Sequence, residues 1–434
     1  MRDLYFSKGD FRLSMWLRYI KSTTRNNPPE AIFYKEGVHS RLYYCVVMPL
    51  SQMLTQAFIA IANGVAVAMG DFMHAEGYFY DEVIQRFREV LAQVKAREEW
   101  LVGAEPINFA GLYLSEDTKD LYEMKLPYRY TEHFEGAFRA LLEEHVPFGI
   151  VHHRNLEEVF KKGLKVLIMP NAACLDEKIA DDIRKFVKSG GGLVATYETS
   201  LYDEIGNMRE DFLLSDVLGA TYCGDTGYWQ DFIELREKHP ITNDLSREIP
   251  IQHVGSQLKV RVKPGTKVLG RVIYPYWKND FYKYVGLQHP PGIPTELPSI
   301  IINKYGAGRV VYFPNRIDAV YASLNLPEAR RLLVNAVRWA AKEQILELEA
   351  PTCIETTLFA QKEKSRIIVH LVNVQPTEET IPVTNIKAKI RVEKPVKKIY
   401  LAPDMTELKY KIEKNLVEVQ IPKVEYHQMI VIEQ

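Results

Sequence analysis

The sequence predicts an α/β protein that ends in an all-β segment. Apolar strands alternate with amphipathic helices from about residue 106 to 345, as in a parallel sheet covered by helices. After residue 346 the helical periodicity disappears, and short β-rich runs separated by turns replace it. A chain of 434 residues is too long for one ordinary hydrophobic core, so we expect about three domains.

Residues 1–105 contain two strand–helix units. Arg41–Met48 is a run of apolar, β-branched and aromatic residues, which predicts a fully buried strand. It is followed by an apolar-faced helix at Ser51–Asn63, a short strand at Val65–Met69 and a long amphipathic helix at Tyr80–Arg97. Two such units can neither close a sheet nor cover both of its faces. The segment is therefore expected to be the end of a larger parallel α/β fold.

The middle segment, residues 106–345, repeats the same alternation in full. The predicted strands are Ile107–Leu114, Val146–His152, Val166–Met169 and Leu193–Thr196, the predicted helices are Glu132–Glu144, Asp176–Ser189 and Pro327–Lys342, and Ile302–Phe313 resembles a hairpin. Strands that alternate with helices of this length predict a doubly wound, flavodoxin-like domain.

The last segment, residues 346–434, predicts a small antiparallel β-sandwich. Its β-rich runs are short, evenly spaced and separated by turns such as Ala402–Asp404. The predicted strands are Arg366–Val374, Ala388–Val392, Lys398–Leu401, Leu416–Ile421 and Met429–Ile432.

The composition excludes several classes of function. The net charge is −1, so nothing favours nucleic acid or an anionic membrane as a partner. The apolar run Leu54–Met69 is interrupted by polar residues and is shorter than the roughly 20 residues that a spanning helix needs. The four cysteines lie far apart without a CxxC pair, and the N-terminus has no apolar signal core, so we expect a soluble cytoplasmic protein.

Most motifs that suggest chemistry have a simpler structural interpretation. Gly190–Gly192 follows a helix and precedes a strand, the reverse of a phosphate-binding loop, so a turn is favoured. His152 and His153 lack a further ligand at metal spacing, and we expect neither a metal nor a cofactor. Cys174 stands between a strand and a helix, where nucleophiles occur, but no histidine is near in sequence and a buried structural cysteine is favoured.

The segment Gly70–Tyr80 carries the candidate substrate-binding residues. It directly follows a buried strand, so Asp71, His74 and Glu76 would project from the carboxyl end of that strand, where barrel enzymes carry their sites. Aromatic residues beside polar groups also suit a sugar, whose ring faces stack while its hydroxyls hydrogen-bond. A polar loop in which Asp71 caps the following turn explains the pattern equally well.

Residues 166–204 resemble the middle domain of the family 42 beta-galactosidases, also called the beta-galactosidase trimerisation domain. The resemblance rests on a hydrophobic strand, then "PN", an amphipathic helix that ends in FVKSGGG, and then LVAT. YGAGRVVYFPNRIDAVYA at 305–322 and RRLLVNAVRWA at 330–340 continue the pattern. In the family this domain resembles a class I glutamine amidotransferase without its catalytic cysteine, and it is linked to trimer formation.

The resemblance implies three domains. Residues 1–105 would be the C-terminal end of a (β/α)8 glycosidase barrel, 106–345 the trimerisation domain, and 346–434 a small β-sandwich. It also implies carbohydrate as the partner and a homo-oligomer, with three subunits by analogy.

The family's catalytic carboxylates have no identified counterpart. Its nucleophilic glutamate ends the seventh barrel strand, which corresponds here to Val47 if Arg41–Met48 is that strand. No carboxylate lies between Glu36 and Asp71, and the fourth strand, which bears the general acid, is not recognised in this sequence. A retaining glycosidase needs two carboxyl groups about 5–5.5 Å apart.

Three functions therefore remain open. The chain could hydrolyse galactosides or similar sugars when a partner or a longer chain completes the barrel. It could be a non-catalytic carbohydrate-binding or oligomerisation protein. It could also be a distinct hydrolase that uses Asp71, His74 and Glu76.

Overall fold

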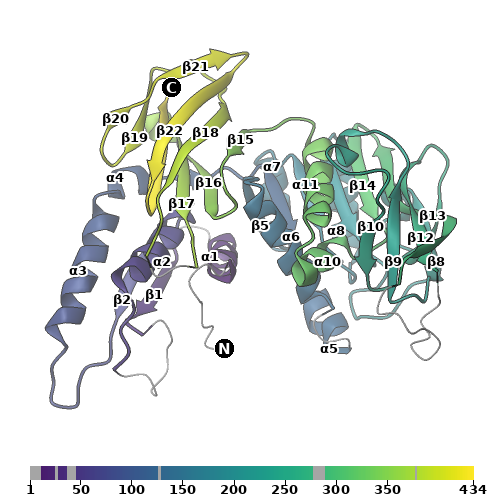
Figure 1. The fold of residues 1–434 in the computed structure, drawn as a ribbon, viewed down its shortest axis with the longest axis horizontal. Helices are drawn as coiled ribbons and strands as arrows, with labels where there is room; N and C mark the ends of the chain where they lie inside the picture. The colour runs from purple at the N-terminus through teal and green to yellow at the C-terminus, as the bar shows by residue number, and fades with distance from the viewer. Residues whose placement is uncertain (1–10, 25–27, 37–44, 126–128, 277–288, 377–378) are drawn as a thin grey trace. The chain divides into compact units, whose positions relative to one another are not determined.

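The chain is a mixed α/β protein, shown in Figure 1 as a computed structural model. The structure describes residues 11–24, 28–36, 45–125, 129–276, 289–376 and 379–434. The chain divides into two compact units, and unit 1 joins both ends of the sequence: Met1–Asn108, Leu142–Gly149 and Ile345–Gln434. Unit 2 comprises Phe109–Leu141 and Ile150–Gln344. The division into three domains at residues 105 and 345 stays a prediction.

Unit 1 contains a small strand–helix part and two antiparallel sheets. The strand–helix part consists of α1 (Arg12–Thr23), β1 (Glu30–Tyr34), α2 (Leu50–Ala62), β2 (Ala66–Gly70), α3 (Asp81–Lys95) and α4 (Glu98–Leu101). One sheet has the order β15 (Leu346–Glu349), β18 (Val383–Arg391), β22 (Leu416–Val424), β21 (Tyr410–Glu413). The other has the order β20 (Thr406–Glu407), β19 (Lys398–Ala402), β23 (His427–Glu433), β17 (Arg366–Asn373), β16 (Ile354–Gln361), β3 (Glu105–Pro106).

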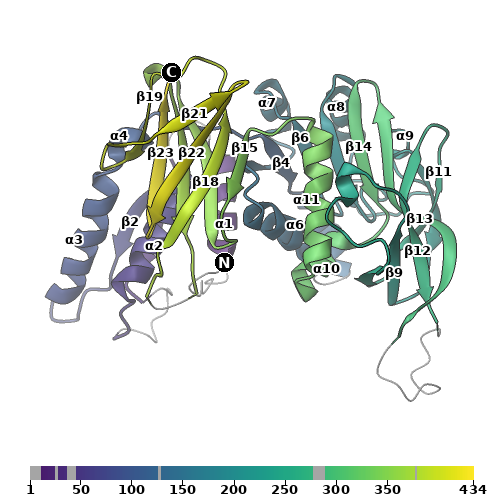
Figure 2. The ribbon, with the colours of Figure 1, turned by 45° about the horizontal axis from the view of Figure 1, so that its top comes forward.

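The two antiparallel sheets pack face to face around one apolar core. Alternate residues of β17 and β18, such as Val369, Leu371, Ile386 and Ala388, meet in this core and are buried. The helix α2 covers the outer face of the six-stranded sheet, where Phe58 packs in one cluster with Val372 of β17. Figure 2 shows α2 beside these strands. The expected β-sandwich is therefore present, and its outer face packs against α1 and α2.

The strands β1 and β2 are parallel neighbours joined through α2. Their register pairs Glu30 with Ala66 and Tyr34 with Gly70. Here the structure differs from the prediction, because the strand that precedes α2 among the described residues is Glu30–Tyr34. Residues 41–44 lie outside the described residues, and Cys45–Met48 form no strand. The apolar character of that run instead places Met48 in a small core with α2 and α3.

Unit 2 is built on a nine-stranded sheet with helices on both faces. The sheet order is β10 (Ile251–Val254), β9 (Gln230–Leu235), β12 (Lys267–Pro275), β13 (Pro291–Tyr305), β14 (Gly308–Phe313), β7 (Gly192–Thr196), β6 (Val166–Met169), β4 (Ala110–Tyr113), β5 (Phe148–Val151). A separate pair joins β11 (Leu258–Val262) and β8 (Ala220–Asp225). The helices are α5 (Glu123–Lys125), α6 (Thr131–Glu143), α7 (Leu156–Lys161), α8 (Glu177–Lys188), α9 (Ser215–Leu218), α10 (Ile317–Leu324) and α11 (Pro327–Ala341).

Five strands of this sheet, β5-β4-β6-β7-β14, have the strand order 2-1-3-4-5 in sequence terms. This is a common order of doubly wound sheets. The helix α8 packs its apolar face, including Ile183 and Phe186, on one side of β6 and β7. Figure 2 shows α11 on the opposite side. The predicted strand at Ile107–Leu114 is shorter than expected and becomes β4.

The glycine motif at 190–192 is a turn, as the sequence predicts, and the glycine segment at 306–308 is also part of a turn. Gly190–Gly192 joins α8 to β7, and an added Cβ at Gly192 would lie 2.5 Å from the carbonyl oxygen of Ala340. Gly306 has a φ of 58° in the turn between β13 and β14. These positions require glycine for backbone packing and conformation, so no phosphate site needs to be invoked.

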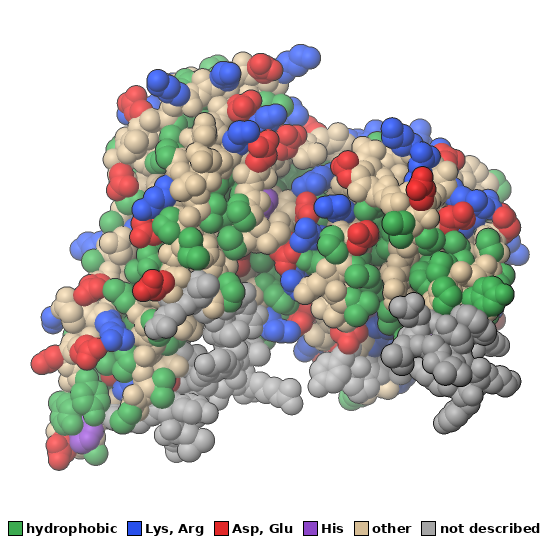
Figure 3. All heavy atoms as spheres, in the orientation of Figure 1, with side chains coloured by type: hydrophobic (Ala, Val, Ile, Leu, Met, Phe, Trp, Pro, Cys, Tyr) green, Lys and Arg blue, Asp and Glu red, His purple; other side chains and the backbone are tan. Residues whose placement is uncertain are grey.

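No helix in the described part of the chain is long and apolar enough to span a membrane. Acidic and basic side chains intermix over the face shown in Figure 3. On that face no large region of one charge is present, in line with the net charge of −1.

Candidate active site at the ends of two parallel strands

The carboxyl ends of β1 and β2 lie side by side and place Lys35 next to Asp71. The backbone N–H of Lys35 donates to the carbonyl oxygen of Gly70 at 3.2 Å, one step beyond the last strand pair. Because parallel strands end at the same edge, side chains that follow them are gathered there. The sequence placed the candidate site only after β2. In the structure the neighbouring end of β1 contributes to the same site.

Asp71 forms a buried ion pair with Lys35. Lys35 Nζ lies 2.5 Å from Asp71 Oδ1, and the two side chains are 1% and 2% exposed. Asp71 Oδ1 also accepts a hydrogen bond from the backbone N–H of Phe72 at 2.7 Å. Asp71 is thus a structural partner of Lys35, a residue that the sequence analysis did not single out.

His74 and Glu76 form a second, exposed group. The His74 ring stacks on Tyr78 with 4.4 Å between the ring centroids. His74 Nδ1 accepts from the backbone N–H of Glu76 at 3.2 Å, and the Glu76 side chain is 78% exposed. Among the described residues no hydrogen bond or ion pair joins Asp71 to either of them. The three predicted site residues are therefore close in sequence but divided between a buried pair and an exposed turn.

Side-chain alternation distinguishes the two faces of the β1–β2 pair. Ala31, Phe33 and Val67 pack against the apolar cluster formed with the helices. Ile32 and Tyr34 alternate with them, and Ile32 is 54% exposed. Consistent with this, a Cβ on Gly70 would lie 2.9 Å from the Tyr34 ring, on the face away from the helices. This second face is the one that a closed barrel would turn inward.

Glu36 is the functional candidate that the sequence analysis missed. It follows β1 by two residues and is 4% exposed. It lies in the turn after the strand, and it would share the face of Ile32 and Tyr34 if the alternation of β1 continued through that turn. Once Glu30–Tyr34 is the strand, the position at its carboxyl end shifts from Val47 to Lys35 and Glu36. In the sequence, the short β-forming run EAIFY at residues 30–34 indicated this strand. The longer apolar run that follows it was interpreted as the strand instead.

An aromatic pair lies beside Glu36 in sequence. The rings of Tyr34 and Phe72 stack, with centroids 5.5 Å apart and an interplanar angle of 14°. Tyr34 ends β1 and Phe72 follows β2, so the pair bridges the two strand ends. Flat apolar surfaces of this kind suit the apolar faces of sugar rings.

The other sequence candidates give no comparable site. Cys174 is 1% exposed, and burial raises the pKa of its thiol to about 11, so the thiol stays protonated at neutral pH. His153 Nδ1 lies 3.7 Å from Glu116, a surface contact. Within the described residues no group of three His, Cys, Asp or Glu side chains is arranged to hold a metal ion.

Known proteins give two kinds of match. Residues 115–326 match the beta-galactosidase trimerisation domain. The whole fold is similar to alpha-L-fucosidase isoenzyme 2 from Paenibacillus thiaminolyticus, with a TM-score of 0.83 and 24% identity over 99% of this chain and 64% of that one. No functionally curated protein matches the sequence.

Two beta-galactosidase structures are also similar. The enzyme from Bacillus circulans sp. alkalophilus gives a TM-score of 0.70 with 14% identity, covering 99% of this chain and 59% of that one. A catalytic mutant of Gan42B, a GH42 beta-galactosidase from G. stearothermophilus, gives 0.67 with 15% identity, covering 100% and 58%. The chain therefore spans less than two thirds of the length of these three proteins.

The fold and the family match together define a glycosidase-related protein. More closely, residues 115–326 match the beta-galactosidase trimerisation domain, and the fold of the chain is similar to that of family 42 beta-galactosidases and of a fucosidase. The resemblance seen in the sequence is thereby confirmed.

Proposed function

We propose that this chain supplies the C-terminal part of a glycoside hydrolase and that Glu36 is the catalytic nucleophile. In this proposal β1 and β2 are the seventh and eighth strands of a (β/α)8 barrel, and the amidotransferase-like part has a flavodoxin-like sheet. The observation that carries the proposal is a buried carboxylate two residues beyond the carboxyl end of β1. The family resemblance places the nucleophile at the end of the seventh barrel strand, and this proposal takes β1 as that strand in place of Arg41–Met48.

The chemistry requires a second carboxyl group. In a retaining mechanism the Glu36 carboxylate attacks the anomeric carbon while an acid protonates the departing glycosidic oxygen. Water then releases the sugar from Glu36, and the same acid, now a base, takes the proton of that water. The acid/base would come from barrel strands supplied by a partner chain or by a longer polypeptide. Turnover by this chain alone is therefore expected to be weak or absent.

Substrate contacts in the proposal come from both strand ends. Tyr34 and Phe72 offer a stacking surface to the sugar ring, and His74 and Glu76 offer hydrogen-bonding groups on the exposed turn. Asp71 acts as a positioning residue through Lys35. Galactosides are the first substrates to test because two similar structures are beta-galactosidases, and fucosides are the second because one is a fucosidase.

The proposal also includes an oligomeric state and a cellular compartment. A homotrimer is proposed because residues 115–326 match a trimerisation domain. The four cysteines are all free, which suits a reducing compartment such as the cytoplasm.

The experiment first reads the DNA upstream of Met1 for strand–helix units with carboxylates at their ends. The encoded segment is then produced together with this chain and assayed with nitrophenyl β-galactoside and α-fucoside. We expect turnover only in the combined sample. Glu36→Ala should lower it by at least about 10³-fold, and azide should restore part of it by replacing the deleted carboxylate.

Glu98→Ala serves as the matched control, because it removes an exposed carboxylate of α4 that has no part in the proposed site and should leave kcat unchanged. Turnover that survives in Glu36→Ala without azide would show that Glu36 is not the nucleophile. If no completing segment exists and the chain binds sugar without turnover, the non-catalytic alternative replaces this proposal.

A further inference from the structure

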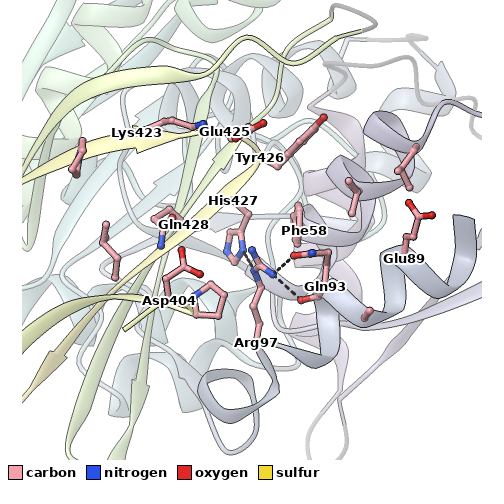
Figure 4. A pocket seen from close by; sticks show the side chains of 16 residues that line it. Phe58, Glu89, Gln93, Arg97, Asp404, Lys423, Glu425, Tyr426, His427 and Gln428 are labelled. Carbon is pink, nitrogen blue, oxygen red and sulfur yellow. Dashed lines mark hydrogen bonds and ion pairs between the residues drawn. The ribbon is translucent and has the colours of Figure 1, made fainter. Parts of the chain in front are cut away.

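Unit 1 contains a recess that shares no residue with the candidate site at the ends of β1 and β2, which is called the strand-end site below. Its volume is about 760 Å³, which is in the range of small-molecule sites. Figure 4 shows that it is lined from one side by α2 and α3 and from the other by the ends of strands in the β-sandwich. Its walls include Phe58, Gln93 and Arg97 from the helices, and Asp404, Glu425 and Tyr426 from the β-sandwich.

A buried guanidinium forms one wall of this recess. Arg97 is 6% exposed, and its carbon Cζ lies 4.6 Å from the centroid of the Phe58 ring. Its Nη1 donates to the backbone carbonyl and to Oε1 of Gln93, at 2.8 and 3.0 Å. Its Nε donates to His427 Nδ1 at 3.0 Å. Among the described residues no carboxylate lies within 4.0 Å of this cation, and no hydrogen bond is made by Nη2.

The histidines that are hydrogen-bonded in a chain from Arg97 are uncharged. An arginine N–H only donates, so His427 Nδ1 must be unprotonated. Burial lowers the pKa values of His427 and His370, so both rings are neutral. His427 then carries its proton on Nε2 and donates it to His370 Nδ1 at 3.0 Å. The chain from Arg97 through His427 to His370 therefore offers no carboxylate or second charge to neutralise Arg97.

Keeping a buried cation without an ion-pair partner is costly. Burial lowers the pKa of Arg97 to about 10, and the charge of Asp404 opposes that shift, so the side chain is still charged at neutral pH. An unused N–H donor on a charged group at a pocket wall is thus available to an incoming acceptor.

The charges around the recess favour a neutral occupant. Arg97 and Lys423 are basic, whereas Glu89, Asp404 and Glu425 are acidic, so the lining has a net charge of −1. Lys423 is already paired with Glu425, with 2.7 Å between Nζ and Oε2. The net negative charge of the lining would repel a free anion. A polyhydroxylated ligand instead uses donors and acceptors together, since each hydroxyl can give and accept a hydrogen bond.

We propose that this recess is an accessory sugar-binding site for a neutral mono- or disaccharide. In this proposal Arg97 Nη2 donates to a ring or hydroxyl oxygen and the Asp404 carboxylate accepts from hydroxyls. The apolar face of the sugar contacts Tyr426 and the lining prolines Pro403 and Pro422. The site binds and does not cleave. It is independent of the hydrolysis proposed for Glu36 and holds carbohydrate on the β-sandwich side of unit 1.

Calorimetric titration of the full chain with galactose, glucose and fucose tests the site, with galacturonate as the charged comparator. We expect saturable binding of at least one neutral sugar and weaker binding of galacturonate. Asp404→Ala removes an exposed acceptor and should weaken binding about tenfold, the effect of losing a hydrogen bond to a charged group. Arg97→Lys should weaken it to a similar extent.

Glu418→Ala is the matched control, an exposed acid on β22 that does not line the recess, and should leave affinity unchanged. Thermal melts verify that each variant is folded, and the Asp404 variant remains informative if Arg97→Lys is destabilised. Absence of saturable binding, or tighter binding of galacturonate, overturns the proposal. Binding that survives Asp404→Ala but is lost in Glu36→Gln also overturns it and assigns the sugar to the strand-end site.

Discussion

At the scale of single residues, buried titratable groups in unit 1 respond to pH in opposite directions. Burial lowers the pKa of His370 to about 3 and that of His427 well below its ordinary value. Burial raises the pKa of Glu355 to about 7, although Ser14 and Arg18 oppose the shift. The histidines and this glutamate therefore affect stability with opposite sign over the same pH range.

The sign follows from which state binds more protons. Below about pH 6.5 the unfolded histidines take up protons that the folded ones refuse, so folding stability falls as the pH drops towards 3. Glu355 holds its proton in the folded state up to about pH 7 but loses it near 4.5 when unfolded. Its contribution therefore favours folding at low pH and is lost as the pH rises from 4.5 to 7.

Replacing Glu355 with glutamine should make acid destabilisation steeper. The variant lacks the proton that folded Glu355 takes up as the pH falls. From pH 7 down to 4.5, its free energy of unfolding should therefore fall by up to about 1.4 kcal/mol more per pH unit than that of the parent. Urea unfolding at pH 5, 6 and 7 measures the slope, with His427→Gln as the partner variant that should flatten it. Equal slopes in the parent and in Glu355→Gln would refute the assignment.

At the scale of elements, the contact between α6 and α10 in unit 2 depends on one glycine. A Cβ on Gly136 would collide with the backbone carbonyl oxygen of Asp318, so the two helix backbones touch. One turn away, His133 Nδ1 lies 2.6 Å from Asp318 Oδ1, and both side chains are fully buried. Thr196 at the end of β7 donates to the other Asp318 oxygen at 2.7 Å. The close approach thus holds a buried polar group at the carboxyl edge of the sheet.

Gly136→Ala should destabilise unit 2 although it improves helix propensity. The propensity gain is about 1 kcal/mol, whereas forcing a methyl group into packed backbone costs about 1–3 kcal/mol and here also displaces the His133–Asp318 pair. We expect a lower urea midpoint and faster hydrogen exchange in α6. Lys178→Ala on the exposed side of α8 is the control and should change stability by less than about 0.5 kcal/mol. A more stable Gly136→Ala variant would contradict the packing argument.

At the scale of the whole molecule, the trimerisation domain makes a prediction about assembly. Sedimentation equilibrium of the purified chain should give a mass near three times 50.1 kDa, with no monomer at micromolar concentration. A trimer interface within residues 115–326 does not require the strand ends of β1 and β2. Glu36→Ala should therefore sediment as the parent does, whereas a monomeric parent would contradict the assembly proposal.

Local patterns in the sequence predicted the elements whose hydrophobic periodicity is complete within one segment. The helices α2, α8 and α11 and the strand β6 lie at the predicted positions to within about two residues. The two glycine turns and the buried, unreactive Cys174 were likewise predictable, because their chemistry depends on their immediate neighbours. By itself the sequence also indicated the resemblance to the beta-galactosidase trimerisation domain, which residues 115–326 match.

Only the tertiary structure decided which segments meet. The short run Glu30–Tyr34 pairs with β2, because pairing depends on register and on the surface that α2 provides. That pairing buries Lys35 against Asp71 and moves the candidate nucleophile to Glu36. In the same way Arg97 meets His427 across 330 residues of sequence. Such contacts follow from packing of distant surfaces, and no local period of the chain encodes them.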